Sequence, residues 1–289
     1  SFLYPLKTEG ESVFNLLIQI LAIYKNNIFV YTTILEINFN IKSVILIMEV
    51  WRCCFLDKVE FYGAGFPYMN IDNLPGKLIV LEGTDGVGRS TQIELLKQWL
   101  EIEGFGVSNT GLARSPLTQP GLDAAKAGHT LGRLTMNLFY ATDFADRLEN
   151  HIIPALSAGF YVLSDRYFYS LIARNVVRGA DPIWARKVYG FALKPDIIFY
   201  LKASVPTLVK RVLKGRGFDY WESGMDVRFA DNLYDSFVKY QTQLINQFDK
   251  MTDEFGFTVI NANRSIQAVF EDIKEHTKKL IESNTRHQI

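Results

Sequence analysis

A glycine-rich turn between an apolar run and an amphipathic segment constrains this chain more than any other stretch. Leu78–Glu82 is short and rich in β-branched and leucine side chains, and Gly83–Thr91 follows it with the sequence GTDGVGRST. This segment fits the phosphate-binding pattern G-x-x-x-x-G-K-[ST] at every fixed position except Arg89, which stands where lysine is expected. The alternative, a turn that binds nothing, is disfavoured because a strand pattern and a helix pattern flank the loop.

The residue types in this loop have physical reasons. Glycines let the backbone bring its N–H groups up to phosphate oxygens, and the following helix directs its N-terminus at the same phosphates. The Ser90 hydroxyl is placed to ligate Mg²⁺, while Arg89 keeps the charge of lysine in a bulkier planar fork. We therefore expect nucleotide phosphates on the following residues: Gly83, Thr84, Gly86, Val87, Gly88, Arg89, Ser90 and Thr91.

Charge and cysteine usage exclude several classes of protein. Lys plus Arg and Asp plus Glu both total 31 in the 289 residues, so net charge gives no reason to expect a nucleic-acid or membrane partner. Cys53 and Cys54 are the only cysteines, and adjacent cysteines without distant partners suggest neither a disulfide framework nor a zinc site. This usage is typical of a reducing cytoplasm, where we expect the protein to act.

Residues 1–75 differ from the rest in composition. Their apolar patches are Val13–Tyr24, Ile28–Ile37 and Val44–Val50, and none reaches the roughly 18 uninterrupted apolar residues of a membrane-spanning helix. The residue bias resembles that of A/T-rich codons, so we expect an extension outside the working fold, with Met69 as a natural start. The alternative is a real extension that lies on a membrane surface or binds a partner.

Residues 76–289 predict one α/β domain, in which apolar strand patterns alternate with helix patterns. Continuously apolar strands favour a parallel sheet covered by helices on both faces, hence three layers. The five expected strands are Leu78–Glu82, Val107–Leu112, Phe160–Leu163, Asp196–Leu201 and Phe257–Ile260. The expected helices are Thr91–Glu103, Leu131–Leu156, Pro206–Leu213, a long helix marked by Phe229 to Met251, and Ile266–Leu280.

Ligands of such sheets bind at the carboxyl ends of the strands. That rule gathers the glycine-rich loop with Arg114, Asp165 and Arg166, which follow two other strands. The combination indicates a kinase acting on a small phosphorylated acceptor: a loop for the donor, Asp165 with Ser90 for Mg²⁺, and Arg114 and Arg166 for the acceptor phosphate.

A glycine-punctuated, charged and aromatic stretch, Lys214–Gly224, resembles a flexible lid. Arg211, Arg216 and Arg228 flank or enter it and could close over the donor. The alternative for each arginine is a solvated or salt-bridged surface group.

Several motifs together resemble the thymidylate kinases and their close relatives among the P-loop nucleoside monophosphate kinases. The resemblance covers Lys77 to about Ile281. It rests on the loop Glu82–Gln92, on Asp165, Arg166 and Tyr167 followed by Ser170, on Lys194, Pro195 and Asp196, and on Arg211 with Arg216 and Gly217.

The resemblance implies a P-loop NTPase fold, ATP with Mg²⁺, transfer to dTMP giving dTDP, and a homodimer. It also implies Asp85 near the acceptor sugar and metal, Arg114 and Arg166 on the acceptor phosphate, and Tyr140 stacked on the thymine. We accordingly expect catalytic roles for Asp85, Arg89, Arg166 and Arg216, and acceptor contacts from Asp85, Arg114, Tyr140, Phe144, Arg166 and Ser170.

Four positions depart from the family pattern. Phe144 replaces the family's base-reading arginine, Leu171 a polar base contact, Arg174 a sugar-checking tyrosine, and Tyr220 a lid arginine. Loss of polar base contacts removes the kind of discrimination that apolar pockets cannot supply. Phe144 is equally well explained as a core residue at helical spacing.

Two functions stay open from the sequence. One is an active dTMP kinase or a relative with an altered acceptor, favoured by Asp85, Asp165, Arg114 and Arg166. The other is a catalytically weak, nucleotide-binding homologue that serves as a regulator or partner-binding module, favoured by the four departures and by Arg89.

Overall fold

The computed structural model describes residues 59–68, 71, 73–128 and 132–285, the side chains to residue 282. The chain divides into two units, Ser1–Leu56 and Asp57–Ile289, and every described residue belongs to the second. Within the described residues, no helix is both long and apolar enough to cross a membrane.

Five parallel strands form one sheet, as the sequence predicts. They are β1 (Lys77–Gly83), β2 (Val107–Gly111), β3 (Tyr161–Asp165), β4 (Ile197–Lys202) and β5 (Thr258–Asn261). Their order across the sheet is β2-β3-β1-β4-β5. The register pairs Leu81 of β1 with Asp165 of β3 and Phe199 of β4, so the glycine-rich loop leaves β1 beside the end of β3.

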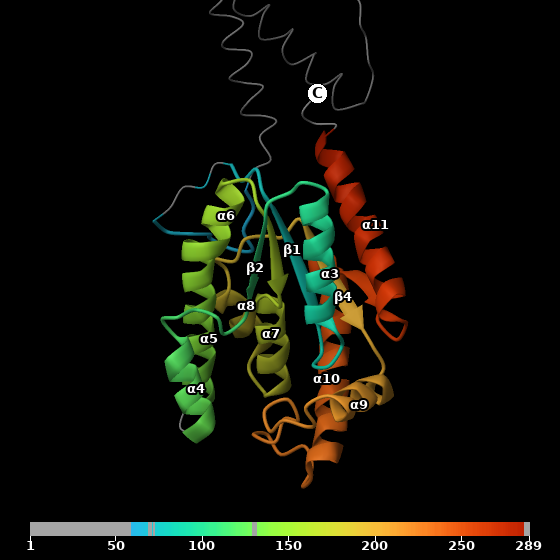
Figure 1. Ribbon diagram of the computed structural model, residues 1–289. Helices are drawn as coiled ribbons and strands as arrows, with labels where there is room; N and C mark the ends of the chain where they lie inside the picture. Colours follow the sequence, from blue (N-terminus) through green and yellow to red (C-terminus); the bar gives the residue numbers. More distant parts are fainter. Residues whose placement is uncertain (1–58, 69–70, 72, 129–131, 286–289) are drawn as a thin grey trace, which may run out of the picture. The chain divides into compact units, whose positions relative to one another are not determined.

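Helices cover both faces of this sheet, and alternation along β1 shows why. Leu78 and Val80 point into one apolar cluster, which contains residues of α5 (Arg133–Arg147), α7 (Phe168–Val177) and α10 (Leu233–Phe255). Ile79 and Leu81 point into the other cluster, with α3 (Arg89–Ile102) and α11 (Ile266–Thr285) (Figure 1). β1 is buried on both faces, which explains its unbroken apolar sequence.

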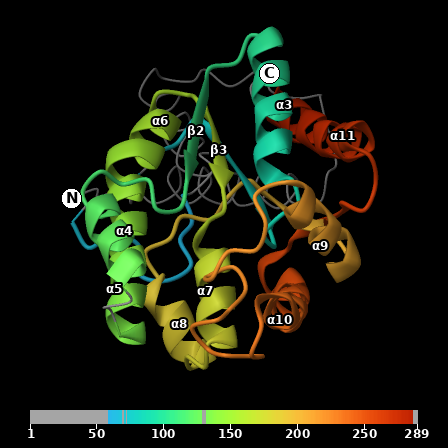
Figure 2. The same cartoon turned by 60° about the horizontal axis from the view of Figure 1, so that its bottom comes forward.

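The carboxyl ends of the strands face α9 (Val205–Lys214) and the segment between α9 and α10, as Figure 2 shows from that end. Pro206 lies in the first turn of α9, where its missing N–H leaves no bond unmade.

The helix predicted over Leu131–Leu156 is interrupted. Described residues form α5, then a π-helical turn at Leu148–Ile152, then α6 (Ile153–Ser157). Pro154, in the first turn of α6, has no N–H to donate to the preceding turn, and a wider turn accommodates that loss.

Three further helical features correct the sequence prediction. Helix α4 (Gln119–Gly128) occupies the end of a polar stretch, with Pro120 and Gly121 in its first turn. Helices α7 and α8 (Pro182–Val188) fill a stretch for which no helix was predicted. Helix α10 begins at Leu233 rather than near Phe229, because the Asn232 side chain caps it by accepting from the Asp235 N–H at 2.8 Å.

The boundary predicted after residue 75 is too late. Phe61 forms an antiparallel bridge with Leu193, and the Tyr62 N–H donates to the Ala192 carbonyl at 3.0 Å. The Tyr62 ring lies 5.1 Å from that of Phe168, between centroids. Residues 59–68 therefore belong to the second unit, because their aromatic rings pack against its core. Residues 1–58 lie outside the described residues, so the interpretation of them as an extension stays a prediction.

Candidate active site

The loop after β1 has the shape that its glycines predict. Gly83 has φ 142°, and a Cβ there would lie 2.6 Å from the Leu201 carbonyl oxygen of the neighbouring strand. Gly88 has φ 102° and caps α3, and a Cβ there would meet nothing within 4 Å. The space in front of the α3 N-terminus is thus open, and its unsatisfied N–H groups suit phosphate oxygens.

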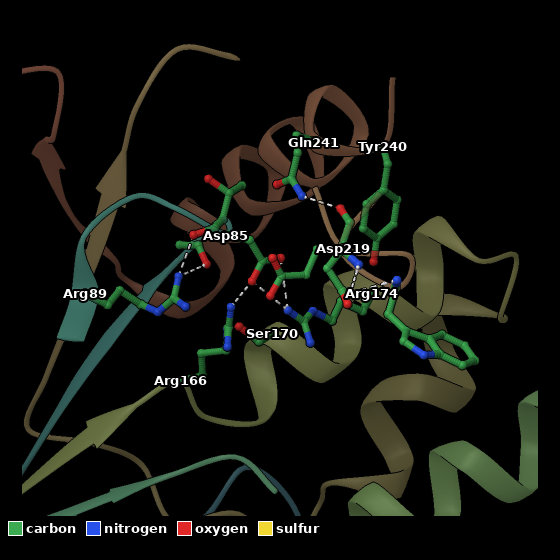
Figure 3. A network of polar contacts seen from close by, with 12 residues as sticks. Asp85, Arg89, Arg166, Ser170, Arg174, Asp219, Tyr240 and Gln241 are labelled. Carbon is green, nitrogen blue, oxygen red and sulfur yellow. Dashed lines mark hydrogen bonds and ion pairs between the residues drawn. The ribbon is translucent and has the colours of Figure 1, made fainter. Parts of the chain in front are cut away.

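Arg89, at the lysine position of the pattern, is built into the loop. Its Nε donates to Asp165 Oδ1 at 2.8 Å, and its Nη1 donates to the carbonyls of Gly83 and Thr84, both at 2.6 Å. Nη2 is the guanidinium nitrogen that bonds no described residue. The planar fork of arginine reaches three acceptors at once, so this cation cross-links the loop and leaves one nitrogen for a ligand. Figure 3 shows Arg89 beside the loop that carries Asp85.

Ser90 and Asp165, the predicted metal pair, are in contact. Ser90 Oγ donates to Asp165 Oδ2 at 2.9 Å. Burial opposes the charge on Asp165, but Arg89 and Arg166 beside it outweigh burial and lower the pKa of its carboxyl. A hydroxyl and an ionised carboxylate are the hard oxygen ligands that Mg²⁺ takes alongside water and phosphate, so the residues present fit this metal.

Asp85, in the middle of the loop, lies between two arginines from other elements. Its carboxylate is 2% exposed, forms an ion pair with Arg166, and accepts from Arg174 Nη2 at 3.1 Å on both oxygens (Figure 3). Burial raises the pKa of Asp85, but Arg166 and Arg174 more than offset it and hold the pKa well below its usual range. Arg174, which departs from the family pattern, is therefore a partner of the loop.

Arg166 directly follows β3 in a conformation that L-residues rarely adopt, with φ 70°. Its N–H donates to the Leu81 carbonyl at 3.0 Å, and its carbonyl accepts from Ser164 Oγ at 2.6 Å. Burial, with Arg89 nearby, lowers the pKa of Arg166 to about 10, so it stays a cation at neutral pH. Backbone strain of this kind persists where surrounding bonds over-determine it, as these do.

Glu82 is a site residue for which no role was predicted from the sequence. Its fully buried carboxylate accepts from the N–H groups of Tyr167 at 2.8 Å and Ser170 at 3.2 Å, and from Ser170 Oγ at 2.5 Å. Burial raises the pKa of Glu82. The signal in the sequence was a carboxylate ending an otherwise apolar strand. Glu82 joins the loop to the start of α7, and the Ser170 hydroxyl points to Glu82.

Arg114 is exposed and bonds no described side chain, but the backbone on either side of it is held by hydrogen bonds to Asp143. The buried Asp143 carboxylate accepts from the N–H groups of Ala113 at 3.0 Å and Ser115 at 2.9 Å, and from Arg147 Nε at 3.0 Å. The sequence analysis missed this pair, although Asp and Arg four apart on a helix were its signal. The pocket that Arg114 lines also includes Ser90, Ile93, Glu94, Asn109, Thr110 and Asp165.

Tyr140 and Phe144 lie one turn apart on α5 in different surroundings. Tyr140 is half-buried, with Lys126 Nζ 5.5 Å from its ring centroid. Phe144 is fully buried, with its ring centroid 4.7 Å from that of Tyr167 and 5.6 Å from that of Phe191. The structure therefore brings Phe144 into the core, which favours the alternative that the sequence left open for it.

The three predicted lid arginines have separate surroundings. Arg211 donates from Nη1 to the Val87 carbonyl at 3.0 Å and so touches the phosphate loop. Arg216 is exposed and forms an ion pair with Glu222. Arg228 is exposed and bonds no described side chain. Of the three, Arg211 is the one in direct contact with the loop.

Comparison with known proteins finds a matching family and several relatives. Residues 81–273 match the sequence model of the family described as thymidylate kinase. The chain is 36% identical over 211 residues to the probable thymidylate kinase 2 of Saccharolobus solfataricus, covering 72% of this chain and 99% of that protein. It is 31% identical over 205 residues to the probable thymidylate kinase of Thermococcus kodakarensis, covering 68% and 94%.

The match to a bacterial relative is shorter. The thymidylate kinase of Bradyrhizobium sp. is 35% identical over 177 residues, which cover 57% of this chain and 76% of that protein. The residues that match the family model begin within β1 and end within α11, so they include the phosphate loop and both arginines that hold Asp85. On this evidence the chain belongs to the thymidylate kinase family.

Proposed function

We propose that this protein transfers the γ-phosphoryl group of ATP to dTMP, giving dTDP, with Mg²⁺ as the metal. The observation that carries the proposal is the position of Asp85. This residue belongs to the phosphate loop, yet it is bound by Arg166 from the end of β3 and by Arg174 from α7. Donor loop and acceptor-side cations thus form one connected site, as transfer between two bound phosphates requires.

The donor side consists of the loop and the start of α3. Backbone N–H groups there bind phosphate oxygens, and Arg89 adds positive charge through Nη2. Ser90 and Asp165 would hold Mg²⁺, which supplies positive charge to the phosphates during transfer. Arg211 binds the Val87 carbonyl and thereby keeps the loop in register with α9.

The acceptor side consists of Arg114, Arg166 and Tyr140. The two guanidinium groups bind the acceptor phosphate, and their forked donors fix its orientation as well as its charge. The half-buried Tyr140 ring offers a face on which a base stacks. Asp85 orients Arg166 through their ion pair, so the carboxylate positions the cation that touches the acceptor.

Recognition of the base rests on apolar contact in this proposal. Phe144 and Leu171 are both buried, so any contact they make with a base is apolar. Ser170 as a substrate contact stays a prediction, since its hydroxyl bonds Glu82. The predicted homodimer and cytoplasmic location likewise stay predictions, and the weak-homologue alternative gains no support from the relatives.

A coupled assay of ADP release on the full chain tests the proposal. ATP and Mg²⁺ would be combined with dTMP, dUMP, dCMP or dGMP in turn, and with no acceptor as the control. We expect the highest kcat/KM with dTMP and little ADP release without an acceptor. Faster turnover of another monophosphate would reassign the acceptor, and ADP release that ignores every acceptor would reject a kinase.

A further inference from the structure

Helix α7 and the residue that caps it carry two arginines one turn apart that reach different parts of the site. Arg174 contacts Asp85 in the phosphate loop. Arg178, the C-cap of α7, turns the other way, toward residues 215–232, which we call the lid segment. One helix end therefore touches both the loop and the lid segment.

Arg178 uses all three of its guanidinium nitrogens on this side. Nε donates to Asp226 Oδ2 at 2.8 Å, and Nη2 donates to Asp226 Oδ1 at 3.1 Å and to the Trp221 carbonyl at 3.1 Å. Nη1 bonds the Tyr240 hydroxyl, and the guanidinium carbon lies 4.8 Å from the centre of that ring. The side chains of Arg178 and Asp226 are 17% and 16% exposed, so this two-pronged ion pair is largely shielded from water.

The lid segment carries charged groups toward the site. Glu222, the residue after Trp221, forms an ion pair with Arg216 while its Oε2 is buried without a hydrogen bond. Burial raises the pKa of Glu222, and the negative charge of Asp85 raises it further. Asp219 Oδ1 shapes the turn by accepting from the N–H groups of Trp221 at 2.9 Å and Glu222 at 3.1 Å (Figure 3).

Two further anchors of this segment lie on α10. Gln241 Nε2 donates to the Glu222 carbonyl at 2.8 Å, and Ser236 Oγ donates to the Ser223 carbonyl at 2.7 Å. On the α7 side, Arg178 donates three hydrogen bonds to the lid segment, two to Asp226 and one to the Trp221 carbonyl. The α10 anchors hold the segment from one side, and Arg178 links it to the helix that carries Arg174.

We propose that Arg178 is a positioning residue, which fastens the lid segment to α7 through Asp226 and so holds Arg216 and Glu222 beside Asp85. The inference rests on the proposed kinase function. Loss of the pair leaves the α10 anchors intact and lets the segment move away from α7. Transfer then slows because Arg216 and Glu222 are out of place, while the phosphate loop still binds ATP.

The test uses two conservative variants of the full chain, Asp226→Asn and Arg178→Gln. Arg186→Gln is the matched control, because Arg186 binds Glu254 by the same two-pronged geometry, 2.5 Å on each side, between α8 and α10. Three quantities are measured: kcat with KM for each substrate, the dissociation constant for ATP, and hydrogen exchange in the lid segment. The informative amides are Ser223, Met225 and Val227, which donate to carbonyls within that segment.

We expect about tenfold lower kcat in both variants, faster exchange at these amides, and a dissociation constant for ATP within about twofold of the wild type. Arg186→Gln should change none of these. The exchanged pair, Arg178→Asp with Asp226→Arg, should recover part of the activity that Arg178→Asp alone loses.

Unchanged exchange and unchanged kcat in both variants would overturn the inference, and so would an equal loss in Arg186→Gln. The exchange experiment needs no substrate. Faster exchange in a protein that phosphorylates no acceptor would therefore reject the proposed function while leaving the attachment of the lid segment in place.

Discussion

Arg89 Nε and Asp165 Oδ1 lie 2.8 Å apart, so the cation of the phosphate loop is held by the carboxylate at the end of β3. The same carboxylate accepts from Ser90 Oγ. The groups proposed to bind the donor phosphate and the metal are thus joined to each other. Arg89 therefore holds the loop together through hydrogen bonds and also gives the loop its positive charge.

Replacing Arg89 with lysine tests this dual role. A lysine keeps the charge but cannot reach Asp165 and two carbonyls from one planar group, so we expect about 2 kcal/mol lower free energy of unfolding and no gain in turnover. Denaturant unfolding and steady-state kinetics measure these quantities. Arg264→Lys, in an exposed pair with Asp272, should cost less than about 0.5 kcal/mol. Higher turnover in Arg89→Lys would show that arginine is a defect of the loop.

The pH dependence of stability should report the Asp85 ion pairs. Because the folded pKa of Asp85 lies below its ordinary value of 3.8, the ion pairs stabilise the protein above pH 3.8 and lose this effect as pH falls through the lower, folded value. Asp85→Asn leaves Arg166 and Arg174 without their ionic partner, so we expect the free energy of unfolding to fall by about 2 kcal/mol at neutral pH. The loss is smaller than for a fully buried ion pair because both arginines are partly exposed. The difference in free energy of unfolding between wild type and Asp85→Asn should become smaller below pH 3.8. A gap that stays constant in thermal melts down to pH 3 would contradict this assignment.

Asp143 should affect the acceptor without touching it. Asp143→Asn weakens the bonds to the N–H groups on either side of Arg114, so we expect KM for the acceptor to rise about tenfold with KM for ATP unchanged. Steady-state kinetics with each substrate varied in turn provides the measurement. Asp123→Asn, on the exposed face of α4, serves as the control. Equal rises in both KM values would point to general loss of structure instead.

Tyr62 should contribute to stability although it precedes the predicted start of the domain. Its ring packs on Phe168 and lies 5.4 Å from that of Phe255, and its hydroxyl lies 2.7 Å from the Tyr169 hydroxyl. Tyr62→Ala in the full chain should lower the free energy of unfolding by about 2 kcal/mol. Tyr68→Ala, where the ring is almost fully exposed, should be neutral. Equal stability of Tyr62→Ala and wild type would restore the boundary after residue 75.

The sheet and the phosphate loop were predictable from sequence because their signals are local. An unbroken apolar run such as Leu78–Leu81 and glycines at fixed spacing each encode their own geometry. Asp165 and Arg166 were placed at the site because the carboxyl ends of parallel strands share one edge.

Other parts depend on partners far away in the chain. Glu82 is hydrogen-bonded to Ser170, which lies 88 residues later in the chain. Tyr62 is hydrogen-bonded to Tyr169, which lies 107 residues later. The helical spacing that marked Phe144 is the same for a core residue and for a residue that lines a pocket. Only packing against Tyr167 and Phe191 separates those two interpretations.

The most direct test of the proposed function follows the phosphoryl group itself. ATP labelled in the γ-phosphate would be incubated with the full chain, Mg²⁺ and dTMP, and the products separated by chromatography. We predict label in dTDP, strongly reduced in Asp85→Asn. Label found only in inorganic phosphate, or equally in wild type and Asp85→Asn, would contradict transfer at the site that joins Asp85 to Arg166.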